Sequence, residues 1–193
     1  MPNKRAIFLD KDGTLIRDVP YNADPGKIEL LAGVADGLRK LGSLGYSFFV
    51  VTNQAGVAKG YFKEEALAGV ENRLQQLLHG SGVTLSGFYY CPHHPEGTVQ
   101  AYIRPCHCRK PQPGLLLEAA EACGINLGDS WMVGDILDDV EAGNRAGCKT
   151  VLIDGLGHER RKGLNGYRSP SYIADSFSEA ADLIIKNTGY GKI

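Results

Sequence analysis

The sequence has no apolar run that approaches the ~18 residues of a membrane-spanning helix. It also lacks an excess of either charge, because 21 basic and 22 acidic residues leave a formal net charge of −1 with no long run of one sign. These absences argue against membrane insertion and nucleic-acid binding, so we expect a small-molecule partner. Residues 1–5 lead directly into a predicted strand without an apolar leader, so we expect a cytoplasmic protein. We further expect it to act as a monomer.

Cysteine is scarce and its count is odd, which argues against a disulfide framework. Three of the five cysteines fall within the 18 residues from Cys91 to Cys108, a clustering that favours metal binding in a reducing compartment. The other two, Cys123 and Cys148, lie in apolar surroundings within or after predicted helices. Buried, unreactive thiols are expected there.

No insertion of domain size interrupts the chain, and its 193 residues, 43% of them hydrophobic, can bury a sizeable core. We expect a single domain over residues 1–193. Short apolar runs alternate with segments of helical periodicity, which predicts an α/β fold with a doubly wound parallel sheet and the first strand at its centre. The predicted strands cover residues 6–9, 46–51, 87–90, 130–133, 150–153 and 172–174; the predicted helices cover 34–44, 63–79, 115–123 and 178–186, another opens near 137, and a frayed tail begins at 189.

Two aspartates separated by one residue follow the first predicted strand. Asp10 and Asp12 therefore lie at the carboxyl end of a strand, which is the ligand-binding edge of an open α/β sheet. Gly13 lets the backbone turn away sharply, with N–H groups pointing towards an anion. One carboxylate can attack phosphorus, the other can protonate the leaving oxygen, and both can help to bind Mg²⁺. The alternative is an ordinary turn or helix N-cap.

Polar groups also follow the second and fourth predicted strands. Thr52, Asn53 and Gln54 supply a hydroxyl and amides that can donate to phosphate oxygens, and a structural turn is the alternative. Asp135 ends the fourth strand and lies at the same edge. Asp139 opens the next helix, where the helix dipole favours an acidic residue in any case, so a supporting role at a metal stays open.

A basic pair, Arg109 and Lys110, precedes a predicted helix. Pro111 biases Lys110 towards extended geometry and so fixes a cation near a helix N-terminus, a place that already favours phosphate. A solvated basic pair is the alternative.

Two close pairs of soft ligands flank a short loop. The pairs follow the spacings C-x-H and C-x-C, with 12 residues between them, and together supply the four ligands of a closed tetrahedral Zn²⁺ site. Such a site leaves no open position, so the zinc would be structural and would staple the loop 91–108. Free thiols and solvated histidines are the alternative. The four candidate ligands are Cys91, His93, Cys106 and Cys108.

These motifs together resemble, in order and spacing, the four motifs of the haloacid dehalogenase (HAD) phosphatases, and the resemblance covers about residues 5–187. The missing insertion would then mean that no large cap domain covers the site. The motifs that carry the resemblance are Asp10-Lys11-Asp12-Gly13-Thr14, Val50-Val51-Thr52-Asn53-Gln54, Lys110-Pro111 and Val133-Gly134-Asp135.

The resemblance implies a catalytic role for four residues. Asp10 would be the nucleophile that forms an aspartyl-phosphate, and Asp12 would protonate the leaving oxygen and later activate water. Thr52 would orient the phosphate, and Lys110 would stabilise the nucleophile and the transferring phosphoryl group. Catalytic Mg²⁺ would be held by Asp10, Asp12 and Asp135.

The resemblance also implies which residues touch the substrate. The polar segment 15–28 would form a small flap over the site, although a solvated turn is the alternative. Arg109 would contact the body of the substrate beyond the transferring phosphate. The implied substrate-binding residues are Asp18, Tyr21, Thr52, Asn53, Gln54, Arg109 and Lys110.

Within the superfamily, the cysteine-histidine run closely resembles the D-glycero-D-manno-heptose 1,7-bisphosphate phosphatases and the related histidinol-phosphate phosphatases. That pattern places the zinc on the four ligands named above, and not on the neighbouring His94 or His107. It implies a phosphorylated sugar as substrate, with loss of the 7-phosphate of the heptose bisphosphate, in heptose and lipopolysaccharide biosynthesis.

One position departs from this pattern: Ile136 stands where the heptose-bisphosphate phosphatases often have a lysine. Histidinol-phosphate hydrolysis or action on another small sugar phosphate therefore stays open. Dehalogenation and a zinc-stapled binding module without activity are more distant alternatives. A polynucleotide 3′-phosphatase is disfavoured by the neutral charge balance.

Overall fold

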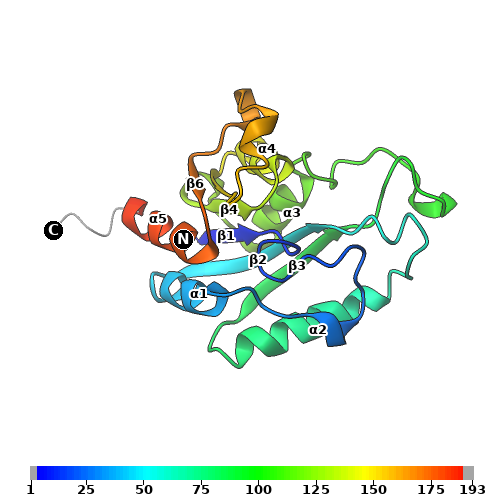
Figure 1. Ribbon diagram of the computed structural model, residues 1–193, viewed down its shortest axis with the longest axis horizontal. Coiled ribbons are helices and arrows are strands. Elements are labelled where there is room, and N and C mark those ends of the chain that lie inside the picture. Colours follow the sequence, from blue (N-terminus) through cyan, green and yellow to red (C-terminus); the bar gives the residue numbers. More distant parts are fainter. Residues whose placement is uncertain (1–3, 189–193) are drawn as a thin grey trace.

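A computed structural model describes residues 4–188, so the predicted frayed tail from residue 189 lies outside the described residues. Six strands form one parallel sheet in the order β3-β2-β1-β4-β5-β6 (Figure 1). The predicted doubly wound sheet is confirmed, because β1 lies inside it between β2 and β4. The strands are β1 (Arg5–Leu9), β2 (Tyr46–Asn53), β3 (Leu85–Cys91), β4 (Trp131–Gly134), β5 (Lys149–Ile153) and β6 (Tyr172–Ala174).

Helices cover both faces of the sheet. One face carries α1 (Val34–Ser43), α2 (Ala66–His79) and α5 (Phe177–Asn187). The other carries α3 (Gly114–Cys123) and α4 (Leu137–Ala146) (Figure 1). The predicted helices are therefore present, although α2 begins three residues later than the sequence predicted because residues 64–65 form a turn.

The residues of β1 explain why this strand is central. Successive side chains of a strand point to opposite faces, so four consecutive apolar residues can fill two cores at once. Ile7 and Leu9 join the core under α1, α2 and α5, whereas Ala6 and Phe8 join the core under α3 and α4. All four are fully buried, so the strand that delivers Asp10 is held rigidly from both sides.

β2 and β3 extend further than the sequence predicted. Thr52 and Asn53, expected just after β2, lie in the strand because they pair with Tyr90 and Cys91 of β3. This pairing fixes the geometry between the two strand ends. The second polar stretch and the first cysteine of the zinc motif are direct neighbours in the sheet.

Over the carboxyl edge of the sheet lie only short segments, mainly residues 15–30 and 92–109. No large cap domain is present within the described residues, as predicted. Across residues 4–188 no helix is both long enough and apolar enough to cross a membrane.

Candidate active site and zinc cluster

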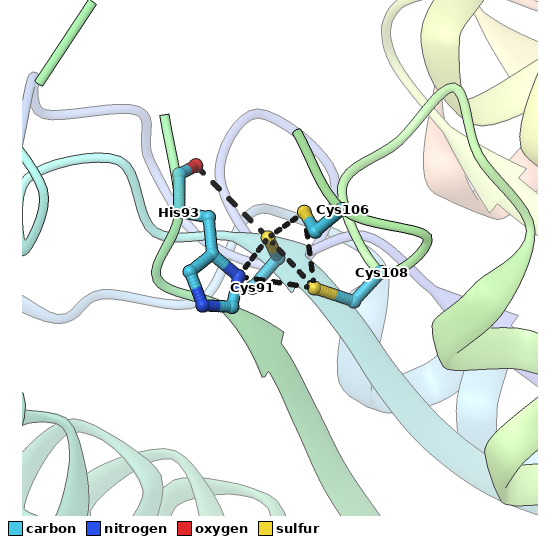
Figure 2. A group of neighbouring side chains, drawn as sticks. All are labelled: Cys91, His93, Cys106 and Cys108. Carbon is cyan, nitrogen blue, oxygen red and sulfur yellow. Dashed lines mark hydrogen bonds between the residues drawn. The ribbon is translucent and has the colours of Figure 1, made fainter. Parts of the chain in front are cut away.

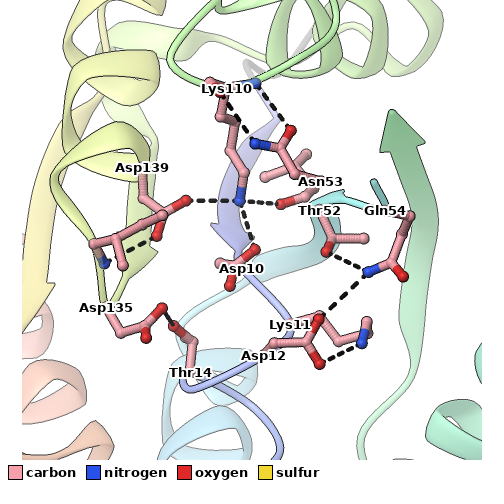
Figure 3. A network of polar contacts seen from close by, with 12 residues as sticks. Asp10, Lys11, Asp12, Thr14, Thr52, Asn53, Gln54, Lys110, Asp135 and Asp139 are labelled. Carbon is pink, nitrogen blue, oxygen red and sulfur yellow. Dashed lines mark hydrogen bonds and ion pairs between the residues drawn. The ribbon is translucent and has the colours of Figure 1, made fainter. Parts of the chain in front are cut away.

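Asp10 and Lys110 form the centre of the site, where β1 ends. The Asp10 N–H donates to the Val133 carbonyl at 3.0 Å, which fixes the turn out of β1 against β4. The Lys110 ammonium donates to Asp10 Oδ1 at 2.5 Å and to the Val51 carbonyl at 2.9 Å, and pairs with Asp139 Oδ1 at 2.6 Å (Figure 3). Burial alone would lower the pKa of Lys110, but the carboxylates of Asp10 and Asp139 raise it above its ordinary value. The site therefore contains a permanent buried cation beside its candidate nucleophile.

Three carboxylates converge next to this cation. One oxygen each from Asp10, Asp135 and Asp139 lies within 4.8 Å of the others. Burial, followed by the charges of Asp10 and Asp139, raises the pKa of Asp135 to about 8. Burial also raises the pKa of Asp139, although Lys110 opposes that shift. The single positive charge of Lys110 thus does not neutralise three neighbouring carboxylates. A hard divalent cation such as Mg²⁺ fits this oxygen cluster.

Two glycines make the carboxylate cluster possible. Gly13 has φ +78°, and a Cβ there would lie 2.1 Å from Asp135 Oδ2. At Gly134 a Cβ would lie 2.2 Å from Asp139 Oδ2. A side chain at either position would push a carboxylate out of the cluster.

The carboxylate of Asp12 lies apart from this cluster. Its Oδ1 accepts from the buried Lys11 ammonium at 2.5 Å, and its Oδ2 faces Gln54 Nε2 at 3.4 Å (Figure 3). Gln54 Nε2 also donates to Thr52 Oγ1 at 2.9 Å. Burial raises the pKa of Asp12, although Lys11 lowers it. Asp12 is therefore held as a separate acid beside the cluster, close to two of the predicted phosphate-orienting groups.

Asn53 engages the backbone of Lys110. Its Oδ1 accepts from the Lys110 N–H at 3.0 Å, and its Nδ2 donates to the Lys110 carbonyl at 3.0 Å. This two-point contact, which spans 57 positions of the sequence, fixes the residue that supplies the buried cation.

The segment 15–28, predicted as a flap, follows the turn out of β1 and is tied back to it by an isolated bridge between Asp12 and Ile16. The exposed ring of Tyr21 lies 4.6 Å from that of Tyr61, and its hydroxyl accepts from the Lys59 ammonium at 2.7 Å. Asp18 is exposed, and its charge raises the pKa of Asp12. The two predicted flap residues thus lie at the rim of the site, with Lys59 and Tyr61 as neighbours of Tyr21.

The four predicted zinc ligands come together (Figure 2). Cys91 Sγ lies 3.5 Å from Cys106 Sγ and 3.1 Å from Cys108 Sγ, and His93 Nδ1 lies 3.6 Å from Cys91 Sγ and 3.4 Å from Cys108 Sγ. A tetrahedral Zn²⁺ with bonds of 2.0–2.3 Å requires separations of roughly 3.3–3.8 Å. Three of these four separations lie in that range, and the Cys91–Cys108 separation of 3.1 Å is slightly shorter. The donor set and its clustering therefore fit a structural zinc ion, and these cysteines form no disulfide.

The zinc cluster adjoins the rest of the site. The Arg109 guanidinium donates to the His93 carbonyl at 3.4 Å, and Lys110 follows directly in the chain. The Thr98 and Val99 N–H groups both donate to the Ala58 carbonyl, at 2.7 and 2.9 Å. The loop 91–108 thus braces both the basic pair and the segment that contacts the flap.

Two residues of this arrangement could not be assigned to the site from the sequence. Asp139 was only a candidate for a supporting role, yet it joins Asp10 and Asp135 in the cluster, whereas the carboxylate of Asp12 does not. The i, i+4 spacing of Asp135 and Asp139 at the start of a helix was a usable signal. No such signal marked Lys11, because a lysine between two aspartates is ordinarily expected to be exposed to solvent.

Comparison with known proteins defines the class first. A family model described as HAD-hydrolase-like matches residues 107–180. The crystal structure of a HAD-like phosphatase from Mesorhizobium loti matches with a TM-score of 0.85 at 34% identity, over 100% of this chain and 90% of that one. Together with the site geometry, these matches place the chain among the HAD-like phosphatases, which are phosphoric monoester hydrolases.

The sequence relatives are more specific. A D-glycero-β-D-manno-heptose-1,7-bisphosphate 7-phosphatase from Pasteurella multocida (strain Pm70) is 38% identical over 181 residues, which cover 94% of this chain and 97% of the relative. A protein of the same name from Escherichia coli (strain K12) is 41% identical over 148 residues, 77% of this chain and 78% of the relative. The chain belongs to this 7-phosphatase family. A D,D-heptose 1,7-bisphosphate phosphatase from B. bronchiseptica, solved with magnesium and phosphate, shares the fold with a TM-score of 0.82 at 24% identity, over 94% of this chain and 98% of that one.

Proposed function

We propose that this protein removes the 7-phosphate of D-glycero-β-D-manno-heptose 1,7-bisphosphate, with Asp10 as the nucleophile. The names of the relatives support the substrate. The observation that carries the chemistry is the placement of Asp10, which directly follows β1, in contact with the Lys110 ammonium and beside Asp135 and Asp139. A nucleophilic carboxylate needs such positive charge nearby, because it must approach an anionic substrate.

The first step forms a phosphoenzyme. A carboxylate oxygen of Asp10 attacks phosphorus, and a P–O bond to Asp10 forms as the P–O bond to the sugar oxygen breaks. The departing sugar oxygen takes the proton of Asp12, whose raised pKa favours the protonated acid that this step needs. Thr52, linked to Asp12 through Gln54, orients the transferring group.

The second step restores the enzyme. A water molecule loses a proton to the Asp12 carboxylate and attacks phosphorus, and the P–O bond to Asp10 breaks. Inorganic phosphate leaves, Asp10 is again a carboxylate and Asp12 is again protonated. Lys110 stays paired with the cluster throughout, because it is fully buried and its departure would leave buried carboxylates without a counter-charge.

The carboxylate cluster supports a Mg²⁺ cofactor. Asp10, Asp135 and Asp139 offer oxygen ligands in one group, and their mutual repulsion is what a divalent cation relieves. When bound, Mg²⁺ would neutralise charge on the transferring phosphoryl group. The sequence predicted that the Asp12 carboxylate binds Mg²⁺, and this stays untested. In the structure that side chain faces Lys11 and Gln54 and not the carboxylate cluster.

Arg109 and the flap are the parts of the site available to recognise the sugar. Arg109 is half-buried next to Lys110 and can make bidentate contacts with a second phosphate. Asp18 and Tyr21 belong to the flap segment, where the Asp18 charge acts on Asp12 and the Tyr21 hydroxyl accepts from Lys59. A structural Zn²⁺ in the cysteine-histidine cluster would keep Arg109 in place. The single-domain organisation, the monomeric state and the cytoplasmic location stay predictions of the sequence.

A phosphate-release assay over a substrate panel tests the proposal. Turnover of the heptose 1,7-bisphosphate, histidinol phosphate and an aryl phosphate is compared for the wild type and Asp10→Asn. We expect kcat/KM to be highest for the heptose bisphosphate, and the variant to be folded but inactive on all three. A preference for histidinol phosphate would overturn the substrate, and substantial turnover by Asp10→Asn would overturn the nucleophile.

A further inference from the structure

A buried glutamate outside the catalytic motifs contacts the helix that carries Asp139. Glu159 lies in the loop between β5 and β6 and is only 8% exposed. Its Oε2 accepts from the Leu137 N–H at 2.9 Å, and its Oε1 pairs with the Lys162 ammonium. A buried carboxylate is costly unless it is paired and hydrogen-bonded. Glu159 meets both conditions, and one of its two partners is the start of α4.

The backbone around Glu159 is itself fixed. Asp154, just after β5, accepts from the Glu159 N–H at 3.2 Å through Oδ1 and from the Arg160 N–H at 3.0 Å through Oδ2. The Arg160 guanidinium also donates to the Asp154 carbonyl at 2.7 Å. Glu159 therefore reaches α4 from a rigid support at the end of the neighbouring strand.

The amide that Glu159 binds lies between two residues of the carboxylate cluster. Leu137 is fully buried and is the first residue of α4, two positions after Asp135 and two before Asp139. The preceding amide, of Ile136, donates to Asp139 Oδ2 at 3.2 Å. Two successive N–H groups at this helix start are therefore bound by carboxylates, one from the cluster and one from Glu159. The direction in which α4 leaves the sheet, and with it the separation of Asp135 from Asp139, depends on both.

We propose that Glu159 is a positioning residue for the magnesium-binding carboxylates, acting through the Leu137 N–H at the first turn of α4. The inference rests on the proposed assignment of Mg²⁺ to Asp10, Asp135 and Asp139. Glu159 touches neither metal nor substrate. Without its carboxylate a buried amide loses its acceptor, and the first turn is free to shift relative to β4. Partners that orient metal ligands typically change metal affinity by about 10- to 100-fold when they are removed.

The test separates this role from a general contribution to stability. Magnesium chloride alone is titrated calorimetrically into metal-free wild type, Glu159→Ala and Glu159→Gln, and kcat at saturating Mg²⁺ is measured in parallel. Glutamine keeps an oxygen that can accept from the Leu137 N–H, so it is the conservative variant. The matched control is Glu179→Ala, which removes another carboxylate bond to a backbone amide, that of Asp175 at 2.7 Å, next to α5.

We expect Glu159→Ala to weaken Mg²⁺ binding by about 10-fold, with kcat at saturating Mg²⁺ largely retained. Glu159→Gln should stay within about threefold of the wild type, and it keeps the test decisive if the alanine variant does not fold. Unchanged Mg²⁺ affinity in a folded Glu159→Ala would overturn the inference, as would equal weakening in Glu179→Ala or a loss in Glu159→Gln as large as in alanine. A wild type that binds no Mg²⁺ at all would overturn the proposed metal site as well.

Discussion

The contact between Asn53 and Lys110 gives the most direct test of how the site is built. The Asn53 side chain makes two hydrogen bonds to the Lys110 backbone, both 3.0 Å long. Each is worth roughly 0.5–1.5 kcal/mol net, so Asn53→Ala should destabilise the protein by about 2 kcal/mol. For a chain of this length that corresponds to a fall in Tm of about 4–8 °C.

The catalytic effect of Asn53→Ala follows from what Lys110 touches. A backbone shift at Lys110 moves its ammonium away from Asp10 and Asp139, and a misplacement of about 1 Å can cost roughly 100-fold in rate. We expect kcat to fall by about 10- to 100-fold while KM for the heptose bisphosphate changes little. Steady-state kinetics and thermal unfolding measure the two effects.

Asn144→Ala is the matched control for this prediction. Asn144 also makes two hydrogen bonds from its side chain to backbone, donating to the carbonyls of Tyr167 and Ser169 at 2.7 and 2.9 Å. A comparable loss of stability with unchanged kcat is expected there. The reasoning would be refuted if Asn53→Ala kept the kcat of the wild type and raised KM instead. That result would make Asn53 a substrate-binding residue, as the sequence alone predicted.

The remaining predictions concern the zinc, the sugar and the acids. Cys106→Ser should lower Tm and zinc content, measured by thermal unfolding and metal analysis; wild type without tightly held zinc would contradict it. Arg109→Ala should lower kcat/KM for the heptose bisphosphate by about 10- to 100-fold, the ~1.5–3 kcal/mol of a charge-assisted hydrogen bond, and affect an aryl phosphate far less; equal losses would assign Arg109 to the chemical step. Asp135 has a pKa raised from 3.8 to about 8, so it binds more protons folded than unfolded, and its stabilising effect in metal-free enzyme is lost as pH rises from about 4 to 8. Mg²⁺ should therefore raise Tm more at pH 8 than at pH 6, and a shift independent of pH would argue against Asp135 as a ligand.

The parts of the fold that the sequence predicted are those with a strong local pattern. Four apolar residues followed by Asp10 predict a buried strand with a candidate site residue at its end, and the structure confirms the buried strand. The zinc motif was equally easy to identify, because two close pairs of soft ligands together supply the four ligands of a tetrahedral Zn²⁺ site. In both cases the residues that carry the signal are close together in the chain.

The parts that the sequence did not predict depend on contacts between distant segments. Asn53 looked like a phosphate donor, yet its amide binds the backbone of Lys110, 57 positions away. Glu159 sits in a glycine- and arginine-rich loop with no periodicity, and its contact with Leu137 arises only when β5 lies beside β4. No local sequence pattern encodes such contacts, because the order of the strands in the sheet determines which distant residues become neighbours.

The sheet order has a consequence for the moment at which the protein becomes an enzyme. β1 pairs with β2 early in the chain, but its other side stays open until residues 131–134 arrive, more than 120 positions after the strand itself. Until then Asp10 has neither the Val133 carbonyl that fixes its turn nor the carboxylates of Asp135 and Asp139 beside it. A half-formed molecule therefore possesses the proposed nucleophile without the groups that surround it in the site. In this protein, phosphate release would report that β4 has been inserted beside β1, so enzymatic turnover can serve as a measure of that step in folding.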